Sequence, residues 1–442
     1  MSSQKKIKIL FYSGHGEIVG GDAKYLFDLV KSLDTKKYDL SIYTDRNYVF
    51  EERAAFALRD RFVVRYLDTF PVLFSTDKVD RRLDEKYMSI LNKKIFGKEL
   101  TVYIRYLIQT LKFNKSSERI KNFILFYRLF QQQKGEVDIF HFNNGGYPGK
   151  ECGLIAILAA YLCGIRKIVM TIHSEPVPRR LPRLFADKLF DWIIPRLCNV
   201  VISASENGKQ ILVKKRNYSE EKVVTIHCGI EDSKCPGEKE LSELKGDLEI
   251  KSGTIVLLMG GNLDEPCKGW DVLIQALKIV KEMYPDFILL LAGHGSEKAE
   301  KAIKDKILHF NLGSNVRLLG YRNDMEVLNG ITDISITPSI YSESTPYTLK
   351  EAMRACKPVI SSDTGGCLEA VDNMSNGIVV PRGDKDALAN AIIKLMKDPL
   401  LSNKMGKKGR ETFEKKFLLS EKIIEHECIY DSLLAEGPIV TS

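Results

Sequence analysis

Short runs of apolar residues alternate along the chain with stretches that carry apolar residues at helical spacing. Each run is only a few residues long, is rich in Ile, Val, Phe and Tyr, and lacks regular alternation with polar residues, as is typical of strands covered on both faces. The pattern therefore predicts parallel α/β sheets. In the first half of the chain the predicted strands are residues 7–12, 39–44, 137–142, 167–172, 200–203 and 222–226.

The second half repeats the pattern after a polar, charged interruption at residues 231–252. We therefore expect two doubly wound domains, residues 1–235 and 236–409, joined by a linker near their boundary. Residues 410–442 follow as a C-terminal segment, whose polar amphipathic helix has no strand after it and must dock on a finished part of the fold. The predicted strands of the second half are residues 254–259, 287–292, 315–319, 334–338 and 358–361.

The composition fits a soluble globular protein of two domains, with 442 residues, 44% hydrophobic and 28% charged. Lys and Arg outnumber Asp and Glu by 66 to 58, a difference of +8, and residues 51–135 alone hold 18 basic and 10 acidic side chains. Nine cysteines without a Cys-x-x-Cys pair argue against a disulfide framework and favour a reducing cytoplasm. No run of 18 apolar residues occurs, so any membrane contact is expected to be peripheral.

The first predicted strand leads into a glycine-rich turn, residues 13–22, and then into a helix. Such a turn lets backbone N–H groups approach a phosphate at a helix N-terminus, where the dipole favours an anion. Gly14 and Gly16 also fit a dinucleotide fingerprint with Asp45 as the ribose ligand, but the third glycine comes one place late at Gly20. A phosphate-binding turn, a nicotinamide site and a purely structural turn all stay open on this evidence.

A second glycine-rich turn, residues 260–270, follows the first strand of the second domain. Lys268 stands in it just before a helix, where its charge would add to the helix dipole and stabilise a diphosphate. A solvated lysine that precedes a helix cap is the alternative.

A third segment, residues 339–353, carries two glutamates after a strand. If Pro346 opens the helix, Glu343 lies in the preceding loop and Glu351 in the second turn. One carboxylate could then face a reacting sugar while the other accepts bonds from a ribose, beside a helix N-terminus that can hold phosphate. Two exposed glutamates on a helix are the alternative.

Together these segments resemble the retaining glycosyltransferase family 4. The string Glu343-x7-Glu351-Ala-Met, followed by Lys357-Pro-Val-Ile360 and Gly365-Gly366-x-x-Glu369, is similar to the nucleotide-sugar signature of that family. Further motifs occur in the family's order over nearly the whole chain: Gly20-Gly21, Thr171-Ile172-His173, Gly229-Ile230, Lys268-Gly269, Gly293-His-Gly295, Leu319-Gly320 and Pro338-Ser339.

The resemblance implies the GT-B fold, in which two Rossmann-like domains face each other across a cleft and a C-terminal helix packs back on the first domain. The acceptor would bind mainly to the first domain and the sugar nucleotide mainly to the second. Lys268 would clamp the diphosphate, Glu343 would face the transferred sugar near its reacting carbon, and Glu351 would bind the ribose. His173 would contact the donor sugar or phosphate. The remaining donor-binding positions implied are Gly20, Gly21, Asn262, Gly293, Arg322, Ser344, Thr345, Tyr347 and Thr348.

Asn262 departs from the family, which commonly has an arginine at this position. An asparagine can donate a neutral hydrogen bond but carries no charge. We therefore expect stabilisation of the diphosphate to depend more heavily on Lys268.

We expect no metal and no cofactor besides the nucleoside diphosphate sugar, which is a co-substrate. The only Asp-x-Asp, residues 384–386, stands at a predicted helix start and is interpreted as a cap rather than a manganese site. The resemblance likewise implies metal-independent transfer. Among the histidines, His141 and His173 follow or end strands of the first domain, and both could reach the predicted cleft.

The sequence thus predicts a hexosyltransferase that moves a sugar from a nucleoside diphosphate sugar, with UDP-sugars favoured, to an acceptor hydroxyl with retention of configuration. The acceptor would be a glycan, glycolipid or lipid-linked molecule, in bacterial surface polysaccharide or glycolipid assembly, and no nucleic-acid partner is expected. Two alternatives belong to other classes: an NAD-dependent oxidoreductase that uses the Gly14–Gly20 loop, and a non-catalytic polyanion-binding protein that uses the charge of residues 51–135.

Residues 101–134 combine seven basic side chains and one acidic side chain with seven aromatic ones. This mixture, together with the basic loop 176–183, suits an anionic bilayer surface. It predicts a cytoplasmic protein that is peripheral on the inner face of the plasma membrane. The alternative is a core helix with a solvated basic face, whose core-facing stripe would be Ile120, Phe123, Ile124, Tyr127 and Phe130.

Overall fold

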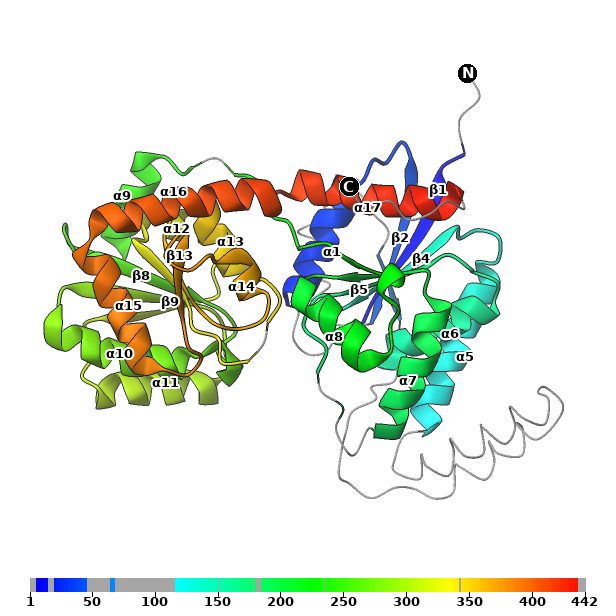
Figure 1. Cartoon of the computed structure of the whole chain (residues 1–442), viewed down its shortest axis with the longest axis horizontal. Coiled ribbons are helices and arrows are strands. Elements are labelled where there is room, and N and C mark those ends of the chain that lie inside the picture. Colours follow the sequence, from blue (N-terminus) through cyan, green and yellow to red (C-terminus); the bar gives the residue numbers. More distant parts are fainter. Residues whose placement is uncertain are drawn as a thin grey trace. The chain divides into compact units, whose positions relative to one another are not determined.

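The computed structural model describes residues 5–14, 20–45, 64–67, 116–149, 151–177, 179, 184–233, 235–341 and 343–435. The chain divides into two compact units (Figure 1). The first consists of Met1–Ile202, Ile211–Val224 and Glu427–Ser442, and the second of Ser203–Gln210 and Thr225–His426. Each unit is built on a parallel sheet with helices between the strands, which confirms the predicted α/β class.

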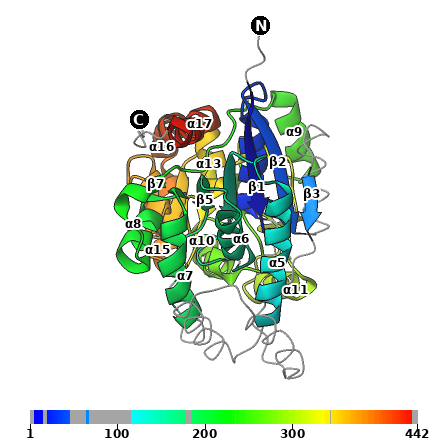
Figure 2. The ribbon, with the colours of Figure 1, turned by 90° about the vertical axis from the view of Figure 1, so that its right-hand side faces the viewer.

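The first unit holds a sheet whose strands are β1 (Ile7–Ser13), β2 (Tyr38–Asp45), β3 (Val64–Leu67), β4 (Ile139–Asn144), β5 (Ile168–Ile172), β6 (Val200–Ser203) and β7 (Val223–Thr225). Their order is β3-β2-β1-β4-β5-β6-β7. Figure 2 shows β1, β2 and β3 side by side, and β1 also runs parallel to β4. The order reverses direction at β1, so the loops after β1 and β4 lie where a doubly wound sheet binds its ligands.

The helices of the first unit are α1 (Gly21–Ser32), α5 (Ser116–Gln132), α6 (Glu151–Leu162) and α7 (Leu184–Leu197), while α8 (Glu206–Arg216) begins in the second unit and ends in the first. α6 is apolar around its whole circumference because α5 and α7 pack against it. α5 buries Phe126 and Phe130 but leaves Ile124 40% and Tyr127 37% exposed. The predicted inward stripe is therefore wrong for these two residues, whose side chains stay exposed on the surface of α5.

The second unit has the strand order β10-β9-β8-β11-β12-β13. The strands are β8 (Ile255–Gly260), β9 (Phe287–Ala292), β10 (Val316–Gly320), β11 (Ile334–Thr337), β12 (Val359–Ser362) and β13 (Gly377–Val380). The helices are α9 (Glu238–Asp247), α10 (Trp270–Met283), α11 (Glu297–His309), α12 (Met325–Ile331), α13 (Tyr347–Arg354), α14 (Cys367–Ala370), α15 (Lys385–Lys397) and α16 (Pro399–Lys416).

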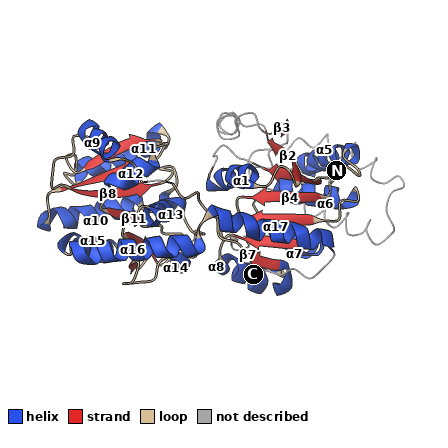
Figure 3. Ribbon diagram, turned by 90° about the horizontal axis from the view of Figure 1, so that it is seen from above, coloured by secondary structure: helices blue, strands red, loops and turns tan. Residues whose placement is uncertain are grey.

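Both faces of this second sheet are covered by helices (Figure 3). Leu257 and Leu289 pack into a core with residues of α10 and α15, whereas their neighbours Val256 and Ile288 pack into another core with α9 and α12. Consecutive strand residues point to opposite faces, so burial on both sides demands an uninterrupted apolar run. This is the physical reason why the strands of this sheet lack polar alternation.

The last helix, α17 (Leu419–Ala435), begins in the second unit and ends in the first. Within the first unit, the hydroxyl of Tyr430 lies 2.7 Å from Nδ1 of His141, and Asp431 forms an ion pair with Lys37 at 2.7 Å. The prediction that a C-terminal helix packs back on the first domain is confirmed. The suggestion that His141 reaches a cleft is wrong, because its ring is 1% exposed inside β4 and its Nε2 bonds the hydroxyl of Thr171 at 2.7 Å.

We predict that Tyr430→Phe destabilises the first unit by about 1–2 kcal/mol, because buried His141 loses the hydrogen-bond partner of its Nδ1. The unfolding midpoint in urea, followed by a probe in the first unit, measures the change. Tyr284→Phe, at the end of α10 in the second unit, is the matched control. An equal shift for the two variants would show that the bond between Tyr430 and His141 adds nothing.

Candidate active site

The loops that follow the strands of the second sheet are hydrogen-bonded to one another. The backbone N–H of Ile340, after β11, donates to the carbonyl of Cys267, after β8, at 2.8 Å. The N–H of Leu263 donates to the backbone carbonyl of His294, after β9, at 3.0 Å. The N–H of Gly366, after β12, donates to the backbone carbonyl of Glu343 at 2.8 Å. The carboxyl edge of this sheet therefore carries one connected group of loops, in the position where parallel sheets bind ligands.

Two glycines make this connection sterically possible. A Cβ on Gly293 would lie 1.8 Å from the carbonyl oxygen of Gly261, and a Cβ on Gly269 would lie 1.9 Å from that of Pro338. Gly269 also has a φ of +77°, a conformation that glycine adopts without strain. Any side chain at either position would push the loops apart.

Lys268 and Glu343 meet at the centre of this group. The Lys268 ammonium lies 3.0 Å from Oε2 of Glu343 and 3.6 Å from Oε2 of Glu265. The hydroxyl of Ser339 donates to the other oxygen of Glu343 at 2.7 Å. The structure thus brings together two residues that the sequence predicts to be catalytic, and the Lys268 side chain keeps 25% of its surface exposed.

The pKa of Lys268 is raised above its ordinary value of 10.5. Burial acts to lower it, but the charge and hydrogen bond of Glu343, with the charge of Glu265, outweigh burial. Lys268 is therefore a cation over the whole physiological range. Because the folded pKa exceeds the unfolded one, the stabilisation from this proton is complete below about 10.5 and is lost as the pH rises through the folded value.

The start of α13 carries the other predicted residues of this region. Glu351 stands in the second turn and is 9% exposed. The hydroxyl of Thr345 donates to the carbonyl of Gly366 at 3.4 Å, while Ser344, Tyr347 and Thr348 are half-buried around the helix start. The predicted set therefore surrounds a helix N-terminus close to Glu343 in the chain.

The remaining predicted positions of the second unit have mainly local partners. Oδ1 of Asn262 accepts from the N–H of Asp264 at 3.0 Å, which closes a turn before Lys268. Nε of Arg322 donates to Asp324 at 2.7 Å, so its guanidinium is held in an ion pair. The N–H of Gly293 donates to the carbonyl of Gly320 at 2.8 Å and links the loops after β9 and β10.

The predicted residues of the first unit form a separate group. His173 follows β5, is 7% exposed, and its Nε2 lies 2.7 Å from Oδ1 of Asn143. Gly20 and Gly21 stand at the start of α1 and are both exposed. Much of the Gly14–Gly20 loop lies outside the described residues.

Sequence reasoning did not single out Asn143 or explain Glu369. Nε2 of His227 lies 2.9 Å from Glu369, whose carboxylate also accepts from the N–H groups of Glu206 and Asn207 at 2.8 Å each. Burial acts to raise the pKa of Glu369, but these hydrogen bonds bring it below its ordinary value. Glu369 thus caps the start of α8.

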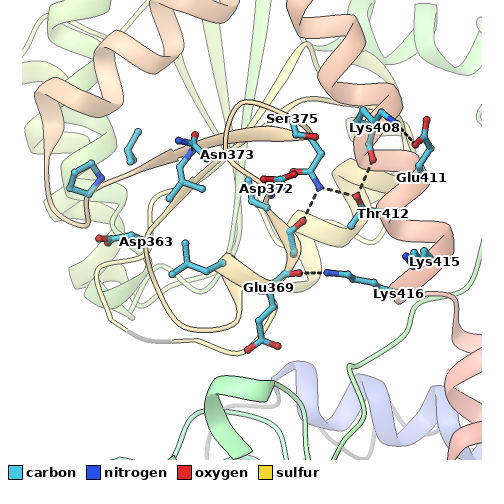
Figure 4. A pocket seen from close by; sticks show the side chains of 17 residues that line it. Asp363, Glu369, Asp372, Asn373, Ser375, Lys408, Glu411, Thr412, Lys415 and Lys416 are labelled. Carbon is cyan, nitrogen blue, oxygen red and sulfur yellow. Dashed lines mark hydrogen bonds and ion pairs between the residues drawn. The ribbon is translucent and has the colours of Figure 1, made fainter. Parts of the chain in front are cut away.

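A hollow of about 840 Å³ lies away from Lys268, between α14, β13 and α16. Figure 4 shows acidic and basic side chains around it, among them Asp372, Glu411 and Lys415. Lys408 forms an ion pair with Glu411 at 2.6 Å. The predicted donor residues Lys268, Glu343 and Glu351 do not line this hollow.

No group of three or more His, Cys, Asp or Glu residues that could hold a metal occurs in the part of the chain that the structure describes. The Asp-x-Asp segment is a helix cap, as predicted. Oδ1 of Asp384 accepts from the N–H groups of Asp386 and Ala387 at 3.0 and 2.9 Å.

Two family models match adjacent parts of the chain. The model described as Glycosyltransferase Family 4 matches residues 19–234, and the model described as Glycosyl transferases group 1 matches residues 242–412. The chain belongs to glycosyltransferase family 4. This membership makes the protein a glycosyltransferase and replaces the oxidoreductase and polyanion-binding alternatives. In the oxidoreductase alternative, Asp45 would bind a ribose. In the structure its carboxylate accepts a hydrogen bond from the buried hydroxyl of Tyr12 at 2.6 Å.

Two curated relatives are similar to this chain over about 70% of its length. An Escherichia coli UDP-Gal:alpha-D-GlcNAc-diphosphoundecaprenol alpha-1,3-galactosyltransferase is 26% identical over 70% of this chain and 79% of its own length. A Bacillus anthracis N-acetyl-alpha-D-glucosaminyl L-malate synthase is 28% identical over 69% of this chain and 77% of its own.

Solved structures support the fold of the family 4 glycosyltransferase. Anabaena HepE in complex with UDP superimposes with a TM-score of 0.75 at 18% identity, covering 96% of this chain and all of that one. Sucrose-phosphate synthase from Thermosynechococcus elongatus has a TM-score of 0.67 at 19% identity, with coverage of 98% and 100%. The GT-B type of fold predicted from the sequence is confirmed.

We predict that Glu343→Gln lowers the pKa of Lys268 relative to the unsubstituted protein. The substitution removes the charge of Glu343, which is the largest effect that raises this pKa against the lowering by burial. A pH titration of the ¹³C-labelled lysine side chains by NMR measures the change. Glu300→Gln, which removes a carboxylate 3.9 Å from exposed Lys304, serves as the control. A Lys268 pKa that stays fixed in Glu343→Gln would contradict the coupling.

Proposed function

We propose that this glycosyltransferase moves a sugar from a UDP-sugar to an acceptor hydroxyl with retention of configuration and without a metal ion. The observation that carries the proposal is the ion pair between Lys268 and Glu343, held among the connected loops at the carboxyl edge of the second sheet. The Lys268 ammonium suits the departing diphosphate, and the Glu343 carboxylate suits the sugar that the diphosphate leaves.

The leaving group of such a reaction is a diphosphate whose negative charge grows as the bond to the sugar breaks. Lys268 offers a permanent cation, and α10 begins two residues later at Trp270, so the positive end of its dipole adds to the field. Asn262 adds no charge. We therefore assign the main stabilisation of the diphosphate to Lys268, which would exchange its bond with Glu343 for bonds to phosphate oxygens.

The sugar becomes electron-poor at its reacting carbon as the diphosphate departs. The Glu343 carboxylate, fixed by Ser339, would stabilise that positive charge once Lys268 has turned to the diphosphate. Glu351 would accept hydrogen bonds from the ribose, and the N-terminal residues of α13 would contact phosphate. In the first unit, His173 and the amides of Gly20 and Gly21 would contact the donor.

The printed names of similar proteins guide the choice of substrates. The Escherichia coli relative is named for a UDP-galactose donor and a diphosphoundecaprenol acceptor, and the Anabaena structure contains UDP. A Staphylococcus aureus relative, 24% identical over 80% of this chain, is named a capsular polysaccharide biosynthesis glycosyltransferase. We propose a UDP-sugar donor, a glycan, glycolipid or lipid-linked acceptor, and a role in bacterial surface polysaccharide or glycolipid assembly.

We predict that Lys268→Ala lowers kcat by about 100-fold or more, the usual cost of removing one group that stabilises transition-state charge. Release of UDP from UDP-sugars, with and without EDTA, measures turnover. Lys278→Ala, an exposed lysine of α10, should keep the normal rate, and EDTA should leave the unsubstituted enzyme unaffected. Near-normal turnover of Lys268→Ala would refute the clamp, while loss of activity in EDTA would refute metal independence.

We further propose a peripheral contact between the first unit and an anionic membrane on the cytoplasmic side. On α5, Arg128 is exposed beside Tyr127, and on α7 the half-exposed Trp192 lies 4.9 Å from the guanidinium of Arg196. Aromatic rings with cations suit the boundary between lipid headgroups and chains. Among the described residues no helix is long and apolar enough to cross a membrane. Residues 101–115 and most of the loop 176–183 lie outside the described residues.

We predict that reversing two of these charges, Arg128→Glu with Arg196→Glu, lowers binding to anionic vesicles about tenfold or more, because each cation near such a surface contributes about 1 kcal/mol. Flotation with phosphatidylglycerol vesicles, against phosphatidylcholine alone, gives the measurement. The control is Lys298→Glu with Lys301→Glu on exposed positions of α11, which changes the net charge equally. Equal loss in both double variants would mean that net charge, and not this face, drives binding.

A further inference from the structure

Two cysteines outside the candidate active site stand where the segment between β7 and α9 meets the end of α13. Cys235 lies in that segment, and Cys356 follows α13 by two residues. Both cysteines belong to the second unit. Both are exposed, so a reagent in solution can reach them.

Hydrogen bonds and an ion pair hold this segment against the end of α13. Nη1 of Arg354 donates to the backbone carbonyl of Glu231 at 2.8 Å. Nη1 and Nη2 of Arg410, on α16, each donate to the carboxylate of Asp232 at 2.7 Å. Nη1 of Arg410 also donates to the carbonyl of Arg354 at 3.1 Å. The segment is thus fixed to the helix end a few residues before each of the two cysteines.

The residues that follow the two cysteines meet at Gly330 of α12. Nζ of Lys357 donates to the carbonyl of Gly330 at 3.0 Å. A Cβ on Gly330 would lie 3.7 Å from Cγ of Pro236, so Pro236 lies beside the same glycine. Cys235 and Cys356 are therefore flanked on both sides by contacts between their own segments, which places the two cysteines next to each other.

The charges of this cluster act on one another, as expected for neighbours. Burial raises the pKa of the Cys356 thiol, Arg410 and Lys357 act to lower it, and the charge of Cys235 acts to raise it. Burial lowers the pKa of Lys357, and the charges of both cysteines act to raise it. One ionised group changes the pKa of another only at short range.

Cys356 adopts a backbone conformation that usually belongs to glycine. Its φ is +58°. Its N–H donates to the carbonyl of Met353 at 3.1 Å, and the N–H of Lys357 donates to that of Ala352 at 2.9 Å, the pattern that ends a helix with a left-handed glycine. A Cβ on Gly406 of α16 would lie 2.0 Å from the carbonyl oxygen of Cys356, so close packing fixes this conformation. Strain at such a position points to a use for the side chain.

We propose that Cys235 and Cys356 form a redox-sensitive dithiol, which a low-molecular-weight disulfide such as oxidised glutathione converts to an intramolecular disulfide. The thiolate of Cys235 attacks one sulfur of the glutathione disulfide and releases a first glutathione thiolate. Cys356 then gives up its proton, and its thiolate attacks the sulfur of Cys235 and releases the second. Two protein thiols and one glutathione disulfide become one protein disulfide and two glutathiones.

The disulfide would tie the segment between β7 and α9 to the end of α13, the helix that carries Glu351. In a reducing compartment the resting state is the dithiol, because disulfides there are usually transient and respond to oxidants. The inference does not depend on the proposed function, since the thiol chemistry requires neither a sugar nor a nucleotide.

The bond can be measured directly in the full-length protein. Reduced protein is incubated in millimolar glutathione buffers of increasing oxidised fraction, quenched with acid, alkylated, and digested for mass spectrometry without reduction. We expect peptides joined through Cys235 and Cys356. They should exceed the glutathione adduct of Cys235 by about tenfold or more, because a neighbouring thiol acts at a high effective concentration. Cys428, which is exposed on α17, should carry single glutathiones only.

Cys356→Gly is the matched variant, because glycine adopts a φ of +58° without strain and leaves the turn intact. It should lose the joined peptides and leave Cys235 as a glutathione adduct, whereas Cys428→Ser should keep them. Oxidation should also raise the urea midpoint of the second unit in the unsubstituted protein but not in Cys356→Gly, since a cross-link restricts the unfolded chain.

Several results would overturn the proposal. Glutathione adducts on either cysteine without joined peptides would show that the two sulfurs do not meet, and a lack of reaction at both would show that they are not accessible. Joined peptides that form only in urea would belong to the unfolded chain. A bond between the Cys235 residues of two molecules would show a contact between copies and not a dithiol within one chain.

Discussion

Close packing between backbones is the constraint on which the candidate active site depends. Gly293 lies against the carbonyl of Gly261, and Gly269 lies against that of Pro338, with no space for a side chain at either place. These contacts hold the loops after β8, β9 and β11 together, and they bring Lys268 to Glu343 although the two residues are 75 positions apart in the chain. The charge pair of Lys268 and Glu343 is thereby set on closely packed loops.

In each unit, backbone contacts and buried polar side chains join the loops at the carboxyl edge of the sheet. In the second unit, glycines let the loops touch directly, and the fully buried Lys350 of α13 adds a bond of 2.8 Å from its ammonium to the carbonyl of Cys228. In the first unit, the N–H of Ser174 donates to the carbonyl of Gly145 at 2.9 Å and joins the loops after β4 and β5. The Asn143 amide adds bonds to the hydroxyl of Ser13 and the carbonyl of Asp22. Buried Asn143 and Lys350 both use their polar groups in hydrogen bonds, which offsets the desolvation cost of burying them.

Local patterns were sufficient for the fold class, whereas the grouping of Lys268 with Glu343 was expected only from the resemblance to the family. Apolar runs identify buried parallel strands, and the glycines on either side of Lys268 indicate a loop after a strand. β3 and β13 escaped this approach, because β3 is interrupted by Arg65 and β13 begins with Gly377, so neither offers a continuous run of strand-forming apolar residues. Contacts between residues far apart in the chain could not be predicted in this way either. The residues around His141 do not indicate its bond to Tyr430, and those around Asn143 do not indicate its bond to His173. The exposure of Tyr127 depends on which neighbours cover α5, which no local pattern contains.

The cysteine beside Lys268 has a consequence for the chemistry of the protein in oxidising or alkylating conditions. Burial and the nearby Glu265 raise the pKa of the Cys267 thiol above 9. Thiolates, not thiols, attack electrophiles, so the raised pKa makes this sulfur less reactive at neutral pH than an unperturbed cysteine, despite its position one residue from Lys268. Maleimide should therefore modify exposed cysteines such as Cys235 and Cys428 before Cys267.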